Sequence, residues 1–124
     1  MNDKNSQTDL PSLVLVPSEE VRGDLEPKGR RAGADRGDPQ VALRLLDTLG
    51  RGNVGIWECE PGGWAIPNRV DTEASYLLAG AVDVTDDSTG ITRRISAGDY
   101  ILMPKGWSGR WDVVETVRKV YAIY

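Results

Sequence analysis

The sequence predicts an all-β protein built as a sandwich or a barrel, and two observations support this prediction. From residue 41 onward, short runs rich in β-branched and aromatic residues are separated by turns of glycine, proline and aspartate. Short strands at such regular intervals are typical of sandwiches and barrels. The length of 124 residues fits a single domain, which is large enough for one core and one pocket.

The first forty residues are expected to form an N-terminal arm, either flexible or lying on the surface, in front of a barrel domain over residues 41–124. Residues 18–38 carry many charges and glycines and few large apolar side chains. Such a stretch cannot bury a core of its own, so it is interpreted as a long loop. The Leu-Val-Leu-Val run at 13–16 is β-prone and is expected to form a strand with no obvious partner in its own barrel.

Two interpretations compete for the segment after the arm. Asp38 and Pro39 suit the start of a helix, with Asp as N-cap and Pro in the first turn. The other interpretation is a strand over 41–46 that turns through 50–53 into a second strand over 54–59, and it is favoured because everything that follows is short β segments. Later turns are expected at 61–63, 80, 86–90, 98–99 and 104–106, and the last strand is expected over 117–124.

The composition excludes several kinds of partner. The 15 basic residues are interleaved with 19 acidic ones for a net charge of −4, so a nucleic-acid partner is not expected. No apolar run is long enough to be a signal sequence or to cross a bilayer, so no membrane partner is expected. The single cysteine, Cys59, cannot form an internal disulfide and is interpreted as a small core residue. These features predict a cytoplasmic protein.

Two glycine-anchored segments resemble the signature motifs of the cupin superfamily. In the first, Glu73 is followed after six residues by Gly80; in the second, Gly98 is followed at the family spacing by Pro104 and Gly106. With the segments at 55–62 and 107–121, the chain is most similar to the small cupins grouped with the ethanolamine-utilisation and ureidoglycine-aminohydrolase cupins. This resemblance implies a single jelly-roll β-barrel and a homodimer, and the unpaired run at 13–16 supports a contribution of the arm to that dimer.

The chain departs from the cupin pattern at the metal ligands. It contains no histidine, and Gly109 stands where the second motif has one. The two histidines of the first motif would fall at 66 and 68, or at 67 and 69, where the chain has Ile, Asn, Pro and Arg. Of the four metal ligands that the cupin pattern leads one to expect, only Glu73 is therefore present. A transition metal needs three or four converging donors. Neither a metal nor another cofactor is predicted.

The alternation of side chains along each strand predicts which residues face the interior of the barrel. Glu73, Ser75 and Leu77 share one face, and if Gly109 points inward, Trp111 and Val113 do too. Glu73 is the candidate general acid or base, with a pKa expected to be raised in a dry barrel. The candidate substrate-binding residues are Trp57, Tyr76, Trp107, Trp111, Lys119 and Tyr121.

Two further groups of residues have open roles. Trp64 follows two glycines and is interpreted as a lid or surface residue. The basic residues Lys105, Arg110, Arg118 and Lys119 are expected to be mostly solvated, although one that points inward could anchor a substrate carboxylate or a developing oxyanion.

The sequence leads to one main functional hypothesis and two alternatives. The main hypothesis is a cupin that binds a small organic molecule and acts as a metal-independent isomerase, epimerase, cyclase or lyase through Glu73 and aromatic walls. The first alternative is a non-catalytic module that binds a metabolite or supports another enzyme. The second, implied by the resemblance, is a metal-dependent hydrolase or aminohydrolase like the ureidoglycine relatives.

Overall fold

The computed structural model describes residues 10–49 and 52–124, and in these it is built almost entirely of strands. The elements in chain order are α2 (Ser18–Val21), β1 (Glu26–Arg30), β2 (Ala34–Arg36), β3 (Gln40–Leu49), β4 (Gly52–Cys59), β5 (Gly62–Ile66), β6 (Glu73–Asp86), β7 (Thr92–Ser96), β8 (Tyr100–Met103) and β9 (Gly109–Ile123). The all-β prediction is confirmed. The strand interpretation of residues 41–46 is also confirmed, because these residues lie in β3 and pair with β4.

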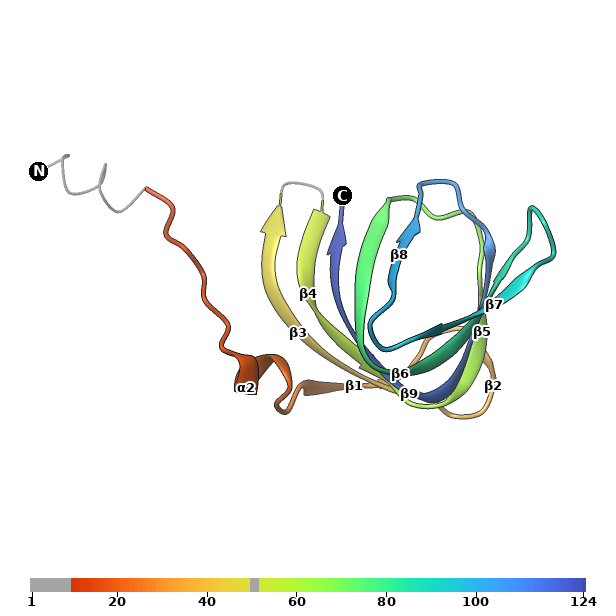
Figure 1. Ribbon diagram of the computed structural model, residues 1–124, viewed down its shortest axis with the longest axis horizontal. Coiled ribbons are helices and arrows are strands. Elements are labelled where there is room, and N and C mark those ends of the chain that lie inside the picture. Colours follow the sequence, from red (N-terminus) through yellow and green to blue (C-terminus); the bar gives the residue numbers. More distant parts are fainter. Residues whose placement is uncertain (1–9, 50–51) are drawn as a thin grey trace, which may run out of the picture.

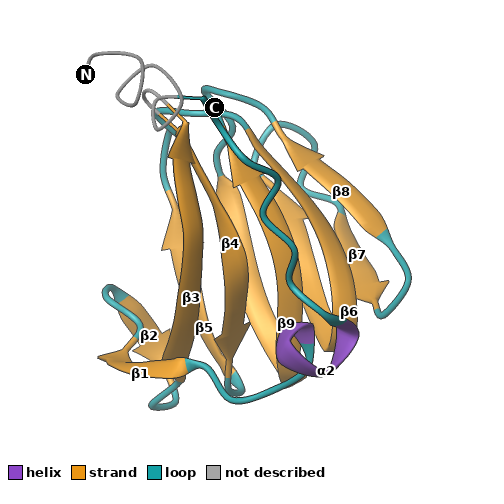
Figure 2. Ribbon diagram, turned by 90° about the vertical axis from the view of Figure 1, so that its left-hand side faces the viewer, coloured by secondary structure: helices purple, strands orange, loops and turns teal. Residues whose placement is uncertain are grey.

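The two longest strands, β6 and β9, form the spine of one curled antiparallel sheet. They pair with each other along almost their whole length. On its other side, β9 pairs with β4 and β5, and β6 pairs with β8 and β7. The sheet therefore curls into the incomplete barrel seen in Figure 1, and Figure 2 shows its strands side by side.

Gly80 marks the irregular centre of this spine. The register between β6 and β9 shifts on both sides of residue 80, and Gly80 has a φ of 85°. A Cβ at this position would lie 2.1 Å from the carbonyl oxygen of Thr116 on β9. Only glycine allows both this backbone conformation and this close approach. The turn predicted at residue 80 is wrong, because β6 continues through this position, but Gly80 does have the positive φ for which a glycine was expected there.

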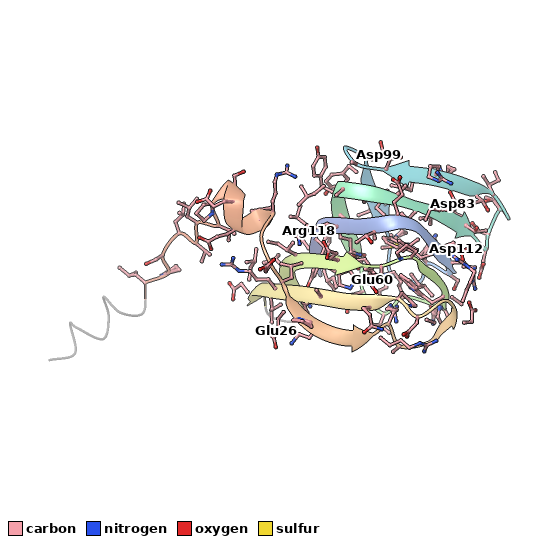
Figure 3. All side chains as sticks on the ribbon, turned by 90° about the horizontal axis from the view of Figure 1, so that it is seen from below. Glu26, Glu60, Asp83, Asp99, Asp112 and Arg118 are labelled. Atoms are coloured by element: carbon pink, nitrogen blue, oxygen red, sulfur yellow. The ribbon has the colours of Figure 1, made fainter. Side chains whose placement is uncertain are left out.

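The inner and outer faces of the sheet differ in chemistry. The inner face holds the apolar core, which consists of Cys59, Trp64, Leu77, Val82, Met103, Trp111, Val113 and Val117. The outer face carries charged side chains, and Asp83, Asp112 and Arg118 lie along it in Figure 3. This alternation confirms that Cys59 is a core residue.

The arm differs from its prediction in two ways. Within the stretch interpreted as a long loop, β1 and β2 pair with β3 and β5. The loop interpretation is wrong there because exposed edge strands are held by backbone hydrogen bonds and need no apolar side chains. Residues 13–16 form no strand in the described chain; they run away from the barrel in Figure 1 and expose Leu13 and Leu15. Residues 1–9 and the turn residues 50–51 lie outside the described part.

Among the residues that the structure describes, no helix has the length and apolar character needed to cross a membrane.

Candidate functional site

A cavity of about 240 Å³ opens on the inner face of the barrel. Its walls come from strands β3, β4, β5, β6, β8 and β9, from the turn between β1 and β2, and from the loop before β6. The lining residues are Arg31, Leu43, Trp57, Trp64, Ile66, Arg69, Glu73, Met103, Trp111, Lys119, Tyr121 and Ile123.

Strand register brings Lys119 and Glu73 together in this cavity. Lys119 lies opposite Trp57 on β4 and opposite Leu77 on β6. Glu73 lies at the start of β6, before Leu77, and is opposite Ile123. Both side chains point into the barrel, and both are less than a tenth exposed. The long lysine side chain reaches diagonally across the sheet, and its Nζ donates a hydrogen bond to Oε2 of Glu73.

Three polar side chains contact the carboxylate of Glu73. Besides Lys119, Oε2 accepts a hydrogen bond of 2.8 Å from Oγ of Ser75, and Oε1 lies 3.3 Å from Nη2 of Arg69. The loop that carries Arg69 is fixed by the second signature segment, because the Arg69 N–H donates to the carbonyl of Trp107 and the Gly106 N–H donates to the carbonyl of Arg69. The second motif segment therefore fixes the loop before Glu73 and positions a cation beside it.

This environment reverses the predicted ionisation of Glu73. Burial by itself raises the pKa of the carboxyl, but the charge and hydrogen bond of Lys119, the hydrogen bond of Ser75 and the charge of Arg69 outweigh it. The pKa of Glu73 is therefore lowered, and the sequence-based expectation of a raised pKa is wrong. The expectation counted the dry surroundings but not the cations, which favour the charged form.

Lys119 lies in a cage of aromatic rings. Its Nζ is 4.5 Å from the ring centre of Trp57 and 4.6 Å from that of Trp111, and the ring of Tyr121 lies 5.9 Å away. Such contacts favour the ammonium form. Burial lowers the pKa of Lys119, although the charge of Glu73 opposes this effect. Lys119 is thus a buried cation held in place by one carboxylate and the faces of aromatic rings.

Three indoles form the aromatic wall of the cavity. Trp57 meets Trp64 and Trp111 edge to face, and the rings of Trp64 and Trp111 stack with their centres 6.2 Å apart. The prediction of Trp64 as a lid or surface residue is wrong, because the two glycines before it belong to strand β5 and the ring is 2% exposed. In the described part of the chain, the indole N–H groups of Trp64 and Trp111 are buried without a hydrogen-bond partner, which costs about 1–3 kcal/mol each. Stability alone therefore does not explain tryptophan at these positions.

The structure brings most of the predicted site residues together. Glu73, Trp57, Trp111, Lys119 and Tyr121 all line the cavity. The other two predicted residues lie elsewhere. Tyr76 is on the outer face and 42% exposed, and Trp107 lines a second cavity of about 280 Å³, where its Nε1 donates to Asp86.

Sequence reasoning missed two cationic residues of the cavity. Arg31 lies in the stretch interpreted as a loop, and Arg69 entered only as a position without a metal ligand. The predicted basic cluster does not exist as one surface. Lys105 is exposed, Arg110 pairs with Asp35 on the outside, and Arg118 donates to Glu58 on the outer face. Strand alternation separates Arg118 from Lys119, which alone points inward.

The side chains present do not fit the metal centre of the cupin pattern. Within residues 10–49 and 52–124, no group of three or more His, Cys, Asp and Glu side chains is placed to hold a metal ion. At the position of the missing histidine, a Cβ on Gly109 would lie 2.2 Å from the backbone carbonyl oxygen of Thr85 and 2.3 Å from the indole of Trp107. That indole therefore fills the space that a ligand side chain at 109 would need. We derive no chemistry through a metal.

The coupling between Glu73 and Lys119 can be measured as a double-mutant cycle. Glu73→Gln is expected to cost about 3–5 kcal/mol of unfolding free energy, because it leaves Lys119 and Arg69 without a counter-charge. Lys119→Met is expected to cost less, because Arg69 and Ser75 still satisfy Glu73. The double variant is expected to be more stable than Glu73→Gln alone. The measurement is urea unfolding of all four proteins at pH 7.

The pH dependence gives the control for this cycle. Because the pKa of Glu73 is lowered in the folded protein, its contribution is complete above the ordinary value of 4.5 and is lost as the pH falls through the lower native value. The difference in unfolding free energy between wild type and Glu73→Gln is therefore expected to become smaller from pH 6 to pH 3. Additive single effects, or a gap that widens in acid, would contradict the pairing. If the single variant Glu73→Gln does not fold, the test is whether the double variant with Lys119→Met does fold, as the pairing predicts.

Comparisons with known proteins agree with this architecture. The model of the EutQ-like cupin domain matches residues 46–121. The chain is similar to the EutQ protein of Clostridium difficile, with 26% identity over 73% of this chain and 75% of that chain and a TM-score of 0.60. It is also similar to an ethanolamine utilization protein Q of Salmonella typhimurium, with 20% identity over 82% of this chain and 98% of that chain and a TM-score of 0.63.

A third structure, a protein of unknown function in the DUF861 family from Pseudomonas syringae, is 23% identical over 84% of this chain and 46% of that chain, with a TM-score of 0.74. The comparison with curated proteins found no match. The family match covers more than half of the sequence and coincides with the barrel strands, and the solved structures share the predicted cupin fold. This chain belongs to the family of EutQ-like cupin domains.

Proposed function

We propose that this domain binds a small organic molecule in the barrel cavity without the help of a metal. The observation that supports the proposal best is the buried Glu73–Lys119 pair on the wall of a cavity of about 240 Å³. A dry cavity of about 150 Å³ accommodates benzene, so this one suits a guest of about ten non-hydrogen atoms. The unpaired indole N–H groups of Trp64 and Trp111 support the same proposal, because each buried N–H costs stability that a purely apolar side chain at a cavity wall would not.

If the domain is an enzyme, we propose that Lys119 is the group that donates a proton to the bound molecule. The lowered pKa of Glu73 keeps it ionised, and three side chains already contact its oxygens, so it holds Lys119 in place rather than acting as an acid. Burial lowers the pKa of Lys119, which makes its proton easier to give up. A metal-independent isomerase, epimerase, cyclase or lyase needs such a proton-transfer group and no redox cofactor. Conversion of a bound molecule, followed by NMR, separates this form from a binding module without turnover.

The names of the EutQ relatives raise ethanolamine as a possible guest. Ethanolamine is a cation at neutral pH, whereas the cavity is lined by Arg31, Arg69 and Lys119 against the single carboxylate of Glu73. A further cation in this space would be repelled. We therefore propose a guest other than ethanolamine itself.

Binding can be tested with three isosteric probes, benzoate, benzamide and benzamidine, which carry charges of −1, 0 and +1. At least one is expected to bind with a dissociation constant in the millimolar range or below, measured by saturation-transfer NMR and tryptophan fluorescence. Ile123→Trp, which adds an indole to the cavity wall, is expected to weaken binding at least tenfold. The control is Val114→Trp, which adds the same ring at an exposed position of β9. Binding of none of the probes, or equal binding to Ile123→Trp, would contradict the proposal.

We also propose that the domain forms a homodimer through its arm. Leu10, Leu13, Val14 and Leu15 are each more than two-thirds exposed in the single chain. The outer face of β6 and β8 exposes Tyr76, Tyr100 and Leu102, and these could pack against the arm of a second copy. The apolar side chains of the arm and those on the outer face of β6 and β8 would then be buried against each other.

Removal of residues 1–16 tests the arm without touching β1, β2 or α2. It also keeps the carbonyls of Val21, at the end of α2, and Gly23, just after it, which accept hydrogen bonds from Arg118. The truncated protein is expected to dissociate to monomers at concentrations where the full chain stays dimeric, measured by sedimentation velocity. Tyr100→Asp in the full chain is expected to have the same effect. A dimer of unchanged strength in both variants would contradict the role of the arm.

The cytoplasm remains the proposed location of the protein. Cys59 has a fully buried side chain, and burial raises the pKa of its thiol to about 11. A lone, unreactive thiol of this kind suits a reducing compartment.

A further inference from the structure

The cavity has a charge opposite to that of the whole protein. The chain carries a net charge of −4, yet three cationic side chains and one carboxylate line the cavity. Lys119 and Glu73 neutralise each other through their direct hydrogen bond. Two positive charges, on Arg31 and Arg69, are left in excess.

Arg69 shares a carboxylate that is already engaged. Its Nη2 lies 3.3 Å from Oε1 of Glu73, and its Nε donates to the carbonyl of Asp71. The side chain is 16% exposed, so water does little to screen its charge. Since Lys119 takes the closer position on Glu73, Arg69 is only partly compensated.

Arg31 has no carboxylate partner anywhere in residues 10–49 or 52–124. Its guanidinium stacks over the ring of Trp64, 4.9 Å from the ring centre, and one nitrogen donates to the carbonyl of Ala32. Burial lowers the pKa of Arg31, and the charge of Arg69 adds to this effect while Glu73 opposes it. The two arginines therefore repel each other across a half-buried space.

A planar anion would relieve this repulsion better than water does. A guanidinium presents several N–H donors in a rigid fork that matches the two oxygens of a carboxylate. Stacking on Trp64 fixes the orientation of the Arg31 fork in advance, so little further entropy is lost on binding. The walls beside the cations are apolar or aromatic, with Leu43, Met103 and Ile123 among them, so the rest of the guest should be uncharged.

Resting on the proposed binding function, we propose that the guest is a small organic monocarboxylate, with its carboxylate held by Arg31 and Arg69 and its apolar body against the indole wall. The cavity volume limits it to about ten non-hydrogen atoms. Tyr121, whose hydroxyl is kept protonated because burial raises its pKa, adds a neutral donor to the same lining.

The charge series of isosteric probes tests this proposal directly. Benzoate is expected to bind wild type at least tenfold more tightly than benzamide, and benzamidine more weakly than either. Arg31→Met is expected to weaken benzoate at least fivefold and to leave benzamide within twofold. The matched control is Arg36→Met, which removes the same charge from the neighbouring strand β2 but lies outside the cavity. Arg31→Gln provides a second variant if Arg31→Met is unstable.

Several outcomes would overturn the proposal and leave the binding function standing. They are equal binding of benzoate and benzamide to wild type, tighter binding of benzamidine, and an equal loss of benzoate affinity in Arg31→Met and Arg36→Met. Binding of inorganic phosphate, measured at the same ionic strength, distinguishes a carboxylate site from a general anion site. Phosphate is expected to bind more weakly than benzoate, and the reverse order would overturn the monocarboxylate. Failure of all three probes would instead remove the binding function itself.

Discussion

The buried carboxylate of Glu73 is the constraint on which the rest of the site depends. A carboxylate with 5% exposure loses its hydration, and only close cations and hydrogen bonds make up for that loss. Lys119, Arg69 and Ser75 supply them from β9, from the loop before β6 and from β6 itself. Lys119, which is equally buried, depends on Glu73 in return. Removing Glu73 would therefore leave the cations of Lys119 and Arg69 without a counter-charge on the cavity wall.

The fold provides this pair by aligning its two longest strands. Glu73 begins β6 and Lys119 lies near the end of β9, and the antiparallel register between the strands brings them to the same end of the barrel. At the position where the cupin motif has an acidic metal ligand, this chain has Glu73, whose charge is balanced by the side chains of Lys119 and Arg69. Trp107 fills the space beside Gly109, so the position of the lost histidine is closed by packing. The result is a cavity whose positive charge is carried by side chains.

Local patterns in the sequence predicted the faces of the strands but not the electrostatics. Alternation correctly placed Glu73 with Ser75, and Trp111 with Val113, because each pair lies two residues apart on one strand. The lowered pKa of Glu73 depends on Lys119, which is 46 positions away and meets it only through the register of β6 and β9. No local pattern contains that contact.

The errors among the site residues have specific physical causes. Tyr76 lies between two inward residues, so alternation from Glu73 already places it on the outer face, where the structure has it. The two glycines before Trp64 suggest a lid or surface residue, although both of them lie in strand β5. Arg31 could not be found from the sequence, because its stretch has the composition of a loop and only the pairing of β1 and β2 with the barrel brings it to the cavity.

The most direct test of this account is the pKa of Glu73 in the folded protein, measured by carbon-detected NMR on its side-chain carboxyl. The account predicts a value below the ordinary 4.5 in wild type, because Lys119 and Arg69 stabilise the charged form, and a higher value in Lys119→Met. A pKa above 4.5 in wild type would contradict it. Glu73 would then be a carboxyl governed by its dry surroundings, and its stabilisation by Lys119 and Arg69 would be wrong.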